Sequence, residues 1–242
     1  MRALTCFTFI ALACATQGDT SSQIIGGKNV PIAKYPFQVS IKYSGQHICS
    51  GSIINNRNIL TSARCIYRLE NLRDNLKIHA GTLWLDIPGA VYDVIDVRIH
   101  EKFDEITNDI AVIYLQTPIR YSMLIQSINL LTNDVNLEGK SCMLAGWGHT
   151  EIGGDISNNL KEIETTVSSQ KECNEISSAT NITICTLIKP GLGGCDGDRG
   201  GPLIIGGTQI GIVSSYSCGI KKLDVHTKVS SFISWIITNL NN

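Results

Sequence analysis

The chain has 242 residues, of which 43% are hydrophobic and 17% are charged, and its formal net charge at pH 7 is −1. A chain of this length buries a substantial core, either as one domain or as two small ones. Because the charges nearly cancel and no basic stripe occurs, we expect neither a nucleic acid nor an anionic membrane as partner.

The first residues have the features of a secretory signal. Arg2 precedes an apolar run over residues 3–15, which ends in the small-residue cleavage pattern Ala13-Cys14-Ala15. The run is too short to span a bilayer, which disfavours the alternative of a signal anchor, and no later stretch is long enough. We therefore expect a signal peptide over residues 1–18, with earlier cleavage after Ala15 as an alternative, and a secreted, extracellular protein.

Many short β-branched runs follow, separated by Gly, Asn and Asp. Examples are the segments 37–41, 91–97 and 208–213, the second of which alternates apolar and polar residues as a half-buried strand does. This pattern predicts an all-β sandwich or barrel. No Pro/Gly-rich linker marks a domain boundary.

The C-terminal segment has a different period. Apolar residues recur at helical spacing after Ser230 and Ser231, two residues that can cap a first helical turn. These apolar residues are Phe232, Ile233, Trp235, Ile236, Ile237 and Leu240. We expect one helix here.

The cysteines and one sequon agree with secretion. Cys6 and Cys14 leave with the signal, so seven of the nine cysteines remain. A secreted chain of this kind is expected to form disulfides, and the odd count leaves at least one thiol free or paired between molecules. Asn181 begins the glycosylation acceptor sequence Asn-Ile-Thr, which we expect on the surface.

A series of short motifs occurs in a fixed order along the chain. They are Ile24-Ile25-Gly26-Gly27, His47-Ile48-Cys49-Ser50-Gly51-Ser52, Ala63-Arg64-Cys65, Asn108-Asp109-Ile110-Ala111-Val112, Gly146-Trp147-Gly148, Gly197-Asp198-Arg199-Gly200-Gly201-Pro202 and Trp235-Ile236. Together they resemble the chymotrypsin–trypsin family of serine proteases over nearly the whole chain after the signal. The resemblance implies a short propeptide over residues 19–23 and a trypsin-like domain over residues 24–242. It also implies two six-stranded antiparallel barrels, with a C-terminal helix across the second.

By this resemblance the positions of the catalytic triad hold Arg64, Asp109 and Arg199, so the histidine and the serine are replaced. A guanidinium stays protonated and has no lone pair with which to act as a base. Arg199 offers no nucleophilic oxygen or sulfur. Loss of either group alone costs on the order of 10⁶ in kcat in subtilisin, so we expect no catalytic residues and no peptidase activity.

The resemblance also assigns the specificity pocket. Gly193 falls at its base, Ser215 and Tyr216 stand where a tryptophan and a glycine form one wall, and Asp224 replaces a glycine of the other wall. We expect these larger side chains to narrow or fill the pocket. We further expect Arg64 to contact Asp109, with bidentate geometry as one option, and Arg199 to reach Asp196 or Asp224.

Asp198 matches the family residue that receives the ammonium of the freed N-terminus, here that of Ile24. Gln23 precedes this residue, so a trypsin would not make the cut, and a protease of another specificity is expected. The resemblance pairs Cys49 with Cys65, Cys173 with Cys185 and Cys195 with Cys218. It leaves Cys142 unpaired and buried, because Ile205 holds the position of its partner.

We expect no cofactor and no metal. The loop Thr82–Gly89 contains one carboxylate, whereas a calcium ion requires six to eight oxygen ligands. The five histidines are dispersed, without metal spacing, and we expect each to be structural or exposed. They are His47, His79, His100, His149 and His226.

The replaced triad on this framework resembles the inactivated protease paralogues of the scabies mite, which are related to the group 3 mite allergen trypsins. That resemblance implies protein binding through an exosite, with interference in a host defence cascade such as complement. A decoy or regulator of active proteases is one alternative. A protease with an unrecognised nucleophile, such as Cys142 or a nearby serine, is another. The segments 64–77 and 149–155 are candidate binding surfaces.

Overall fold

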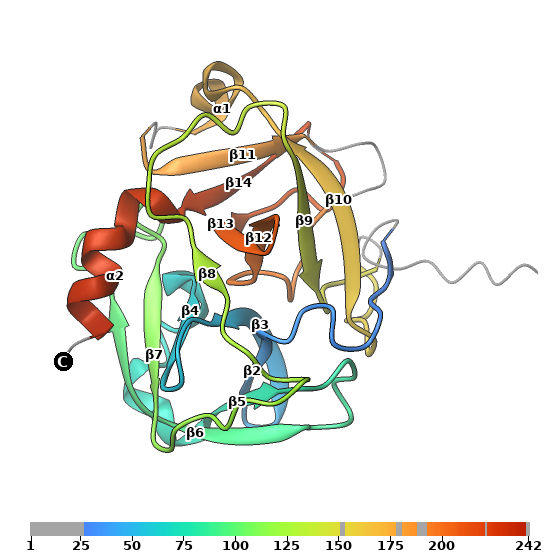
Figure 1. Ribbon diagram of the computed structural model, residues 1–242, viewed down its shortest axis with the longest axis vertical. Coiled ribbons are helices and arrows are strands. Elements are labelled where there is room, and N and C mark those ends of the chain that lie inside the picture. Colours follow the sequence, from blue (N-terminus) through green and yellow to red (C-terminus); the bar gives the residue numbers. More distant parts are fainter. Residues whose placement is uncertain (1–26, 151–152, 178–180, 188–192, 221, 241–242) are drawn as a thin grey trace, which may run out of the picture.

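The computed structural model describes residues 27–150, 153–177, 181–187, 193–220 and 222–240 (Figure 1). The expected signal peptide, the segment 19–23 and Ile24 lie outside these residues. Figure 1 shows two groups of strands, one above the other, with the chain passing from the lower group to the upper one.

The first group is a closed barrel of six antiparallel strands. Its strand order is β2-β3-β4-β7-β6-β5. The strands are β2 (Gln38–Tyr43), β3 (Gln46–Ile53), β4 (Asn58–Thr61), β5 (Leu76–Ala80), β6 (Ala90–Ile99) and β7 (Ala111–Leu115). Two 3₁₀ segments, η1 (Ala63–Cys65) and η2 (Glu70–Asn75), separate β4 from β5. Fully buried β-branched side chains such as Val39, Ile59 and Ile113 fill the interior, which is why the barrel closes around them.

The second group closes in the same way. Hydrogen-bonded neighbours run β9-β10-β11-β14-β13-β12 and return to β9. The strands are β9 (Ser141–Gly146), β10 (Lys161–Val167), β11 (Thr183–Leu187), β12 (Pro202–Ile205), β13 (Thr208–Ser215) and β14 (Leu223–Lys228). Two short strands add to this sheet, β1 (Lys28–Asn29) on β10 and β8 (Asn129–Leu130) on β13. The expected pair of six-stranded barrels is confirmed.

A buried glutamate fixes the N-terminal segment to the second barrel. Glu162 on β10 accepts hydrogen bonds from the Lys34 ammonium at 2.8 Å and from the Tyr35 hydroxyl at 2.6 Å. Its side chain is only 1% exposed. Because the two donors flank this carboxylate, the chain leading to β2 is held close to the second barrel.

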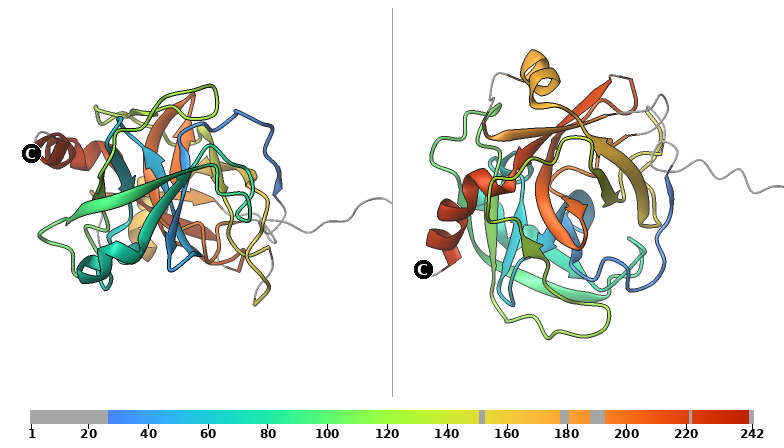
Figure 2. Two further views of the ribbon diagram at one scale, coloured as in Figure 1. Left: turned by 90° about the horizontal axis from the view of Figure 1, so that it is seen from below. Right: turned by 45° about the horizontal axis from the view of Figure 1, so that its top comes forward.

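The C-terminal helix differs from the expectation in two details. A 3₁₀ turn, η3 (Val229–Phe232), comes first and α2 (Ile233–Leu240) follows it directly. The Ser231 hydroxyl donates to the carbonyl of Asn181, and no side-chain cap opens the 3₁₀ turn, so the serines do not cap the helix. The helix also lies on the outside of the molecule beside β7 of the first barrel, not across the second (Figures 1 and 2).

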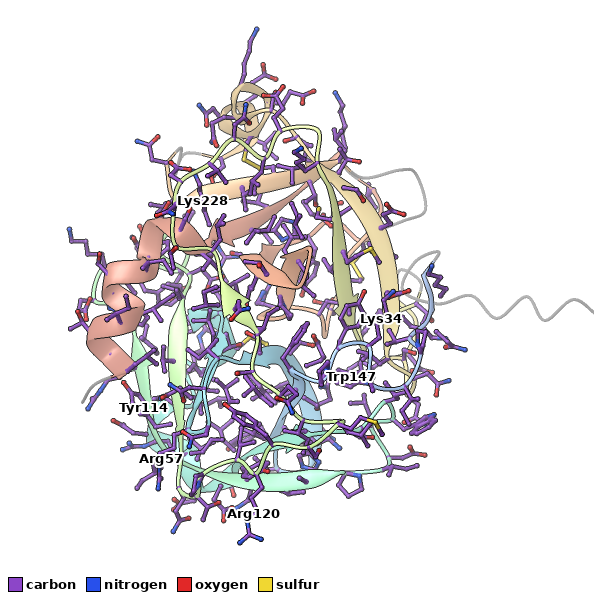
Figure 3. All side chains as sticks on the ribbon, in the orientation of Figure 1. Lys34, Arg57, Tyr114, Arg120, Trp147 and Lys228 are labelled. Carbon is purple, nitrogen blue, oxygen red and sulfur yellow. A yellow bond between two sulfur atoms is a disulfide. The ribbon has the colours of Figure 1, made fainter. Side chains whose placement is uncertain are left out.

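The contacts of α2 explain its position. Phe232 and Ile236 share one apolar cluster with Leu60 and Val112 of the first barrel and with Ile212 of β13. The Tyr114 hydroxyl of β7 donates to the Asn239 carbonyl, and Figure 3 labels Tyr114 near the C-terminal end of α2. A matching apolar surface on the first barrel thus receives the helical apolar face. None of the helices in the described ranges combines the length and the hydrophobicity that a membrane crossing requires.

A second helix, α1 (Gln170–Ile176), was not expected from the sequence. Its signal is a capping box: the Ser169 hydroxyl accepts from the Glu172 N–H, and the two side chains lie 3.2 Å apart. The helix is short and has no apolar period, which is why periodicity did not reveal it.

The disulfides confirm the expected pairing. Bonds join Cys49 to Cys65, Cys173 to Cys185 and Cys195 to Cys218. Cys142 is free, 1% exposed and part of the apolar core of the second barrel. Burial raises the pKa of its thiol to about 12, which keeps the sulfur protonated and unreactive.

Candidate functional site

The sequence-predicted site residues meet where the two barrels face each other. Arg64 comes from η1, Asp109 lies two residues before the start of β7, and Arg199 lies in the loop before β12. Hydrogen bonds across the junction fix this region: the Ser50 N–H donates to the Arg199 carbonyl at 2.8 Å, and the Thr227 hydroxyl donates to the Asp109 carbonyl at 2.8 Å.

Asp109 is 2% exposed, and three donors satisfy its carboxylate. The Ser62 hydroxyl (2.6 Å) and the Arg64 backbone N–H (2.9 Å) donate to Oδ1. The Ser214 hydroxyl donates to Oδ2 at 2.6 Å. Ser62 escaped the sequence analysis, because a side chain 47 residues from its partner leaves no local signal.

The guanidinium of Arg64 therefore stays at the edge of this group. Its Nε is 3.8 Å from Asp109 Oδ2, and its Nη2 donates to the carbonyl of Ile106 at 3.2 Å. The expected contact with Asp109 is therefore present as a single long ion pair and a backbone hydrogen bond, and the bidentate option is not realised. The Nε atom is buried and donates to no acceptor in the described chain.

Arg199 contacts neither of the carboxylates that were expected. Its Nε donates to the Ser214 carbonyl at 2.9 Å, and its guanidinium carbon lies 5.1 Å from the centre of the Tyr216 ring. Both carboxylates are engaged elsewhere. Asp196 accepts from the Tyr216 hydroxyl at 2.5 Å, and Asp224 accepts from the backbone N–H groups of Gly194 and Ser217.

The pocket residues crowd around one glycine. A methyl group added to Gly194 would lie 3.6 Å from Tyr216 Cβ and 3.7 Å from Asp224 Oδ2, which measures how near both side chains approach. Asp224 is 1% exposed, and burial raises the pKa of its carboxyl. Gly193 is buried as well, whereas Ser215 is exposed; residues 188–192 on the same segment lie outside the described chain.

Asp198 lies in a tight cradle. It is fully buried and accepts from the backbone N–H groups of Gly148 (2.8 Å) and Cys195 (2.9 Å). A Cβ atom on Gly146 or Gly148 would come within 2.0–2.3 Å of this carboxylate, so only glycine fits at either position. Burial, with a smaller contribution from nearby carboxylates, raises the pKa of Asp198 to about 7. Its expected partner, Ile24, lies outside the described residues, so the ion pair stays a prediction.

His47 holds the loop that carries Asp198 and Arg199. A carbonyl only accepts, so Nε2 donates to the Gly197 carbonyl at 2.9 Å and Nδ1 accepts from the Ser40 hydroxyl at 2.8 Å. Burial lowers the pKa of this imidazole to about 4 and keeps it neutral. In the described residues, no three His, Cys, Asp or Glu side chains are grouped in a way that could hold a metal ion.

Comparison with known proteins agrees with this architecture. A family model described as Trypsin matches residues 24–236. Chymotrypsin-2 of Vespa crabro is 37% identical over 220 residues, which cover 89% of this chain and 99% of the relative. Trypsin beta of Drosophila erecta is 32% identical over 247 residues, covering 95% of this chain and 96% of the relative. The solved structure of mouse neuropsin, a serine protease, superposes with a TM-score of 0.81 at 26% identity, covering 89% and 99% of the two chains. The chain therefore belongs to the trypsin family of serine proteases.

Proposed function

We propose that this member of the trypsin family is a secreted, catalytically inactive homologue that acts by binding protein. The observation that carries the proposal is the placement of Arg199, whose Nε is hydrogen-bonded to the Ser214 carbonyl and whose guanidinium rests on Tyr216. Arg199 occupies the position that the family resemblance assigns to the nucleophile. An arginine can neither attack a carbonyl nor leave this position without losing both contacts.

The base is missing as well. Arg64 stands at the expected histidine position, and its guanidinium is held by the Ile106 carbonyl at the edge of Asp109. A guanidinium has no lone pair to offer, so it cannot take a proton from an attacking group. Cys142 is no substitute nucleophile, because it is buried in the second barrel with a raised thiol pKa.

Two further features support a cleft closed to substrates. The Ser214 carbonyl is already an acceptor for Arg199, so a peptide backbone that paired with it would have to share this oxygen and lie beside the guanidinium. Tyr216 and Asp224 both approach Gly194 in the expected pocket. We infer that binding uses an exosite and that the target is a protein of a host defence cascade such as complement, as the resemblance to the mite paralogues implies.

The charged side chains of the first candidate exosite are mostly paired. On the segment 64–77, Arg73 pairs with Asp96 at 2.6 Å, Arg68 lies 3.9 Å from Glu105, and Lys77 pairs with Asp93. This surface is therefore largely neutralised by its own neighbours and offers little long-range steering. The segment 149–155 includes residues 151–152, which lie outside the described chain.

The test is an activity assay on the mature chain starting at Ile24, against a broad fluorogenic peptide library, with an active trypsin as positive control. We expect no turnover above a mock preparation. Capture from host plasma with the immobilised chain then identifies the partner: a complement protein supports the proposal, whereas a protease or a protease inhibitor favours the decoy alternative. Turnover that persists through purification and is absent from the mock preparation would contradict the proposal.

A further inference from the structure

We infer that the cleft holding Arg64 and Arg199 is a binding site for a carboxylate, and specifically for the C-terminal carboxylate of a peptide. The inference goes beyond the proposed function, because it concerns the cleft and not an exosite. It rests on unused hydrogen-bond donors and uncompensated positive charge in one small region.

Arg199 uses only a fraction of its donors. A guanidinium carries five N–H groups, and within the described chain Arg199 commits only Nε, to the Ser214 carbonyl. Neither Nη atom has an acceptor in the described residues, and neither is among the fully buried unpaired atoms, so both reach solvent. The Tyr216 ring fixes the plane of the guanidinium from one face. The two Nη groups of Arg199 are thus held in a fixed plane and can donate to an acceptor from outside the chain.

Arg64 adds a second guanidinium to the same region. Its Nε lies 3.8 Å from Asp109 Oδ2, and that oxygen accepts from Ser214 Oγ at 2.6 Å. The carbonyl of the same serine accepts from Arg199. Ser214 is therefore the common neighbour of both groups. Arg64 Nη1 has no acceptor in the described residues and is not fully buried.

The local charge is not balanced. Arg64 has Asp109 as its carboxylate partner, at 3.8 Å, and three other donors already bind that carboxylate; Arg199 forms no ion pair within the described residues. The other candidate, Asp196, accepts the hydrogen bond of Tyr216 and forms no ion pair with Arg199. An anion that enters the cleft thus meets positive charge without having to displace an internal partner.

The backbone supplies two more donors. The N–H groups of Asp198 and Gly200 donate to the carbonyls of Cys195 and Val213. In the same loop, the N–H groups of Gly197 and Arg199 donate to no backbone acceptor in the described residues. His47 and Ser50 fix the Gly197 carbonyl, so these peptide planes are held in place. Backbone N–H groups need an acceptor, and a carboxylate offers about four lone-pair positions for them and for the arginine fork.

The geometry selects a chain end over an internal segment. An extended peptide that paired with the Ser214 carbonyl would have to share this oxygen with Arg199 and lie beside the guanidinium. Tyr216 and Asp224 lie next to Gly194 in the expected pocket, where the resemblance assigns smaller residues. A carboxylate at the end of a peptide can approach end-on without either contact.

The experiment measures binding of acetyl-trialanine with a free C-terminus to the mature chain, by calorimetry and by NMR titration. We expect the same peptide with an amidated C-terminus to bind about 10-fold more weakly or worse, because it loses the charge-assisted bonds. Arg199→Gln should weaken binding of the acid by a similar factor, and Arg64→Gln should weaken it less. Higher salt should also weaken binding.

Arg120→Gln is the matched control, because Arg120 is exposed and points away from the molecule at its lower edge (Figure 3). It should bind the acid like the parent chain, and near-UV circular dichroism should show that all variants are folded. Equal affinity for acid and amide, or an unchanged affinity in folded Arg199→Gln, would overturn the inference. Equal binding of an amidated peptide with an internal Asp would contradict the end-on geometry. None of these measurements requires turnover, so they are independent of the peptidase assay.

Discussion

The ring of Tyr216 lies 5.1 Å from the guanidinium carbon of Arg199, while its hydroxyl donates to Asp196 over 2.5 Å. One side chain thereby contacts the cation with its ring and binds the Asp196 carboxylate with its hydroxyl. Burial and the bond to Asp196 raise the pKa of the Tyr216 hydroxyl, so it remains a donor at all physiological pH values. The arrangement at the end of β13 depends on Tyr216 as much as on the arginine.

Restoring the two catalytic side chains should not restore activity. In Arg64→His/Arg199→Ser a base and a nucleophile are present, but Tyr216 and Asp224 still approach Gly194. We expect kcat/KM on fluorogenic peptides to remain near the mock level. Adding Tyr216→Gly and Asp224→Gly should raise it by at least about 10-fold, provided that thermal melting shows a folded protein. Trypsin-like rates from the two reversions alone would show that the pocket is open.

Acidification should destabilise the protein through His47. Its folded-state pKa is about 4, below the ordinary value of 6.5, so the unfolded chain binds the proton more strongly between these values. The stability contribution is complete above about pH 6.5 and decreases as the pH falls towards 4. At pH 5 the loss amounts to about 2 kcal/mol.

Urea unfolding at pH 7 and pH 5 measures this loss, and His47→Gln should reduce the difference between the two pH values. Glutamine retains an N–H donor for the Gly197 carbonyl but has no proton to gain. An identical pH dependence in the variant would assign the effect to other groups, of which the buried His226, whose pKa burial lowers to about 3, is the first to test.

Cleavage before Ile24 should stabilise the fold. Asp198 has a raised pKa of about 7 in its cradle, so its charged form lacks compensation and stability falls as the pH rises from about 4 towards 7. A new ammonium at Ile24 would supply the missing cation and reverse that trend. Near pH 7 we expect the free energy of unfolding of a chain starting at Ile24 to exceed that of a chain starting at Asp19 by about 3 kcal/mol.

Chemical denaturation of both chains tests the difference, and Asp198→Asn, which cannot form the ion pair, should abolish it. Equal stability of the two chains, with Asp198 intact, would mean that the N-terminus does not reach the cradle.

A fourth disulfide should form when Ile205 is replaced by cysteine. The register of β9 and β12 pairs Leu203 with Leu144 and Ile204 with Met143, so the next step places Ile205 opposite Cys142. Ile205→Cys should oxidise to a bond worth about 2–4 kcal/mol of stability. Mass spectrometry detects the loss of two hydrogens, and Ile205→Ser is the control that cannot crosslink. Two persistent thiols under oxidising conditions would show that the strands do not bring the sulfurs together.

The framework was readable from the sequence because its signals are local. The two closed barrels, the three disulfides and the unpaired Cys142 were implied by the family resemblance that the short motifs and their order carry. The partners of the two arginines did not follow. A long side chain can reach acceptors on several segments that are far apart in the sequence. The contacts with Ser214, Ile106 and Tyr216 form only when the barrels are packed together.

The same limit applies to the C-terminal helix. Its apolar period predicted a helix. The helix packs on residues of β4 and β7, more than 100 residues earlier, and its own sequence does not indicate that surface. Local propensity identifies the element, and the complementary apolar surface elsewhere decides where it lies.

The closure of both barrels limits the ways in which another protein can bind to this one. Every long strand in the described chain has a hydrogen-bonded neighbour on each side, and only the two-residue strands β1 and β8 end the second sheet. The described strands thus offer no long unpaired backbone edge to which a strand of another protein could add, and the same closure protects them from sheet-to-sheet aggregation. A partner has to recognise side chains and loops, and substitutions at those positions can change the partner while leaving the architecture intact.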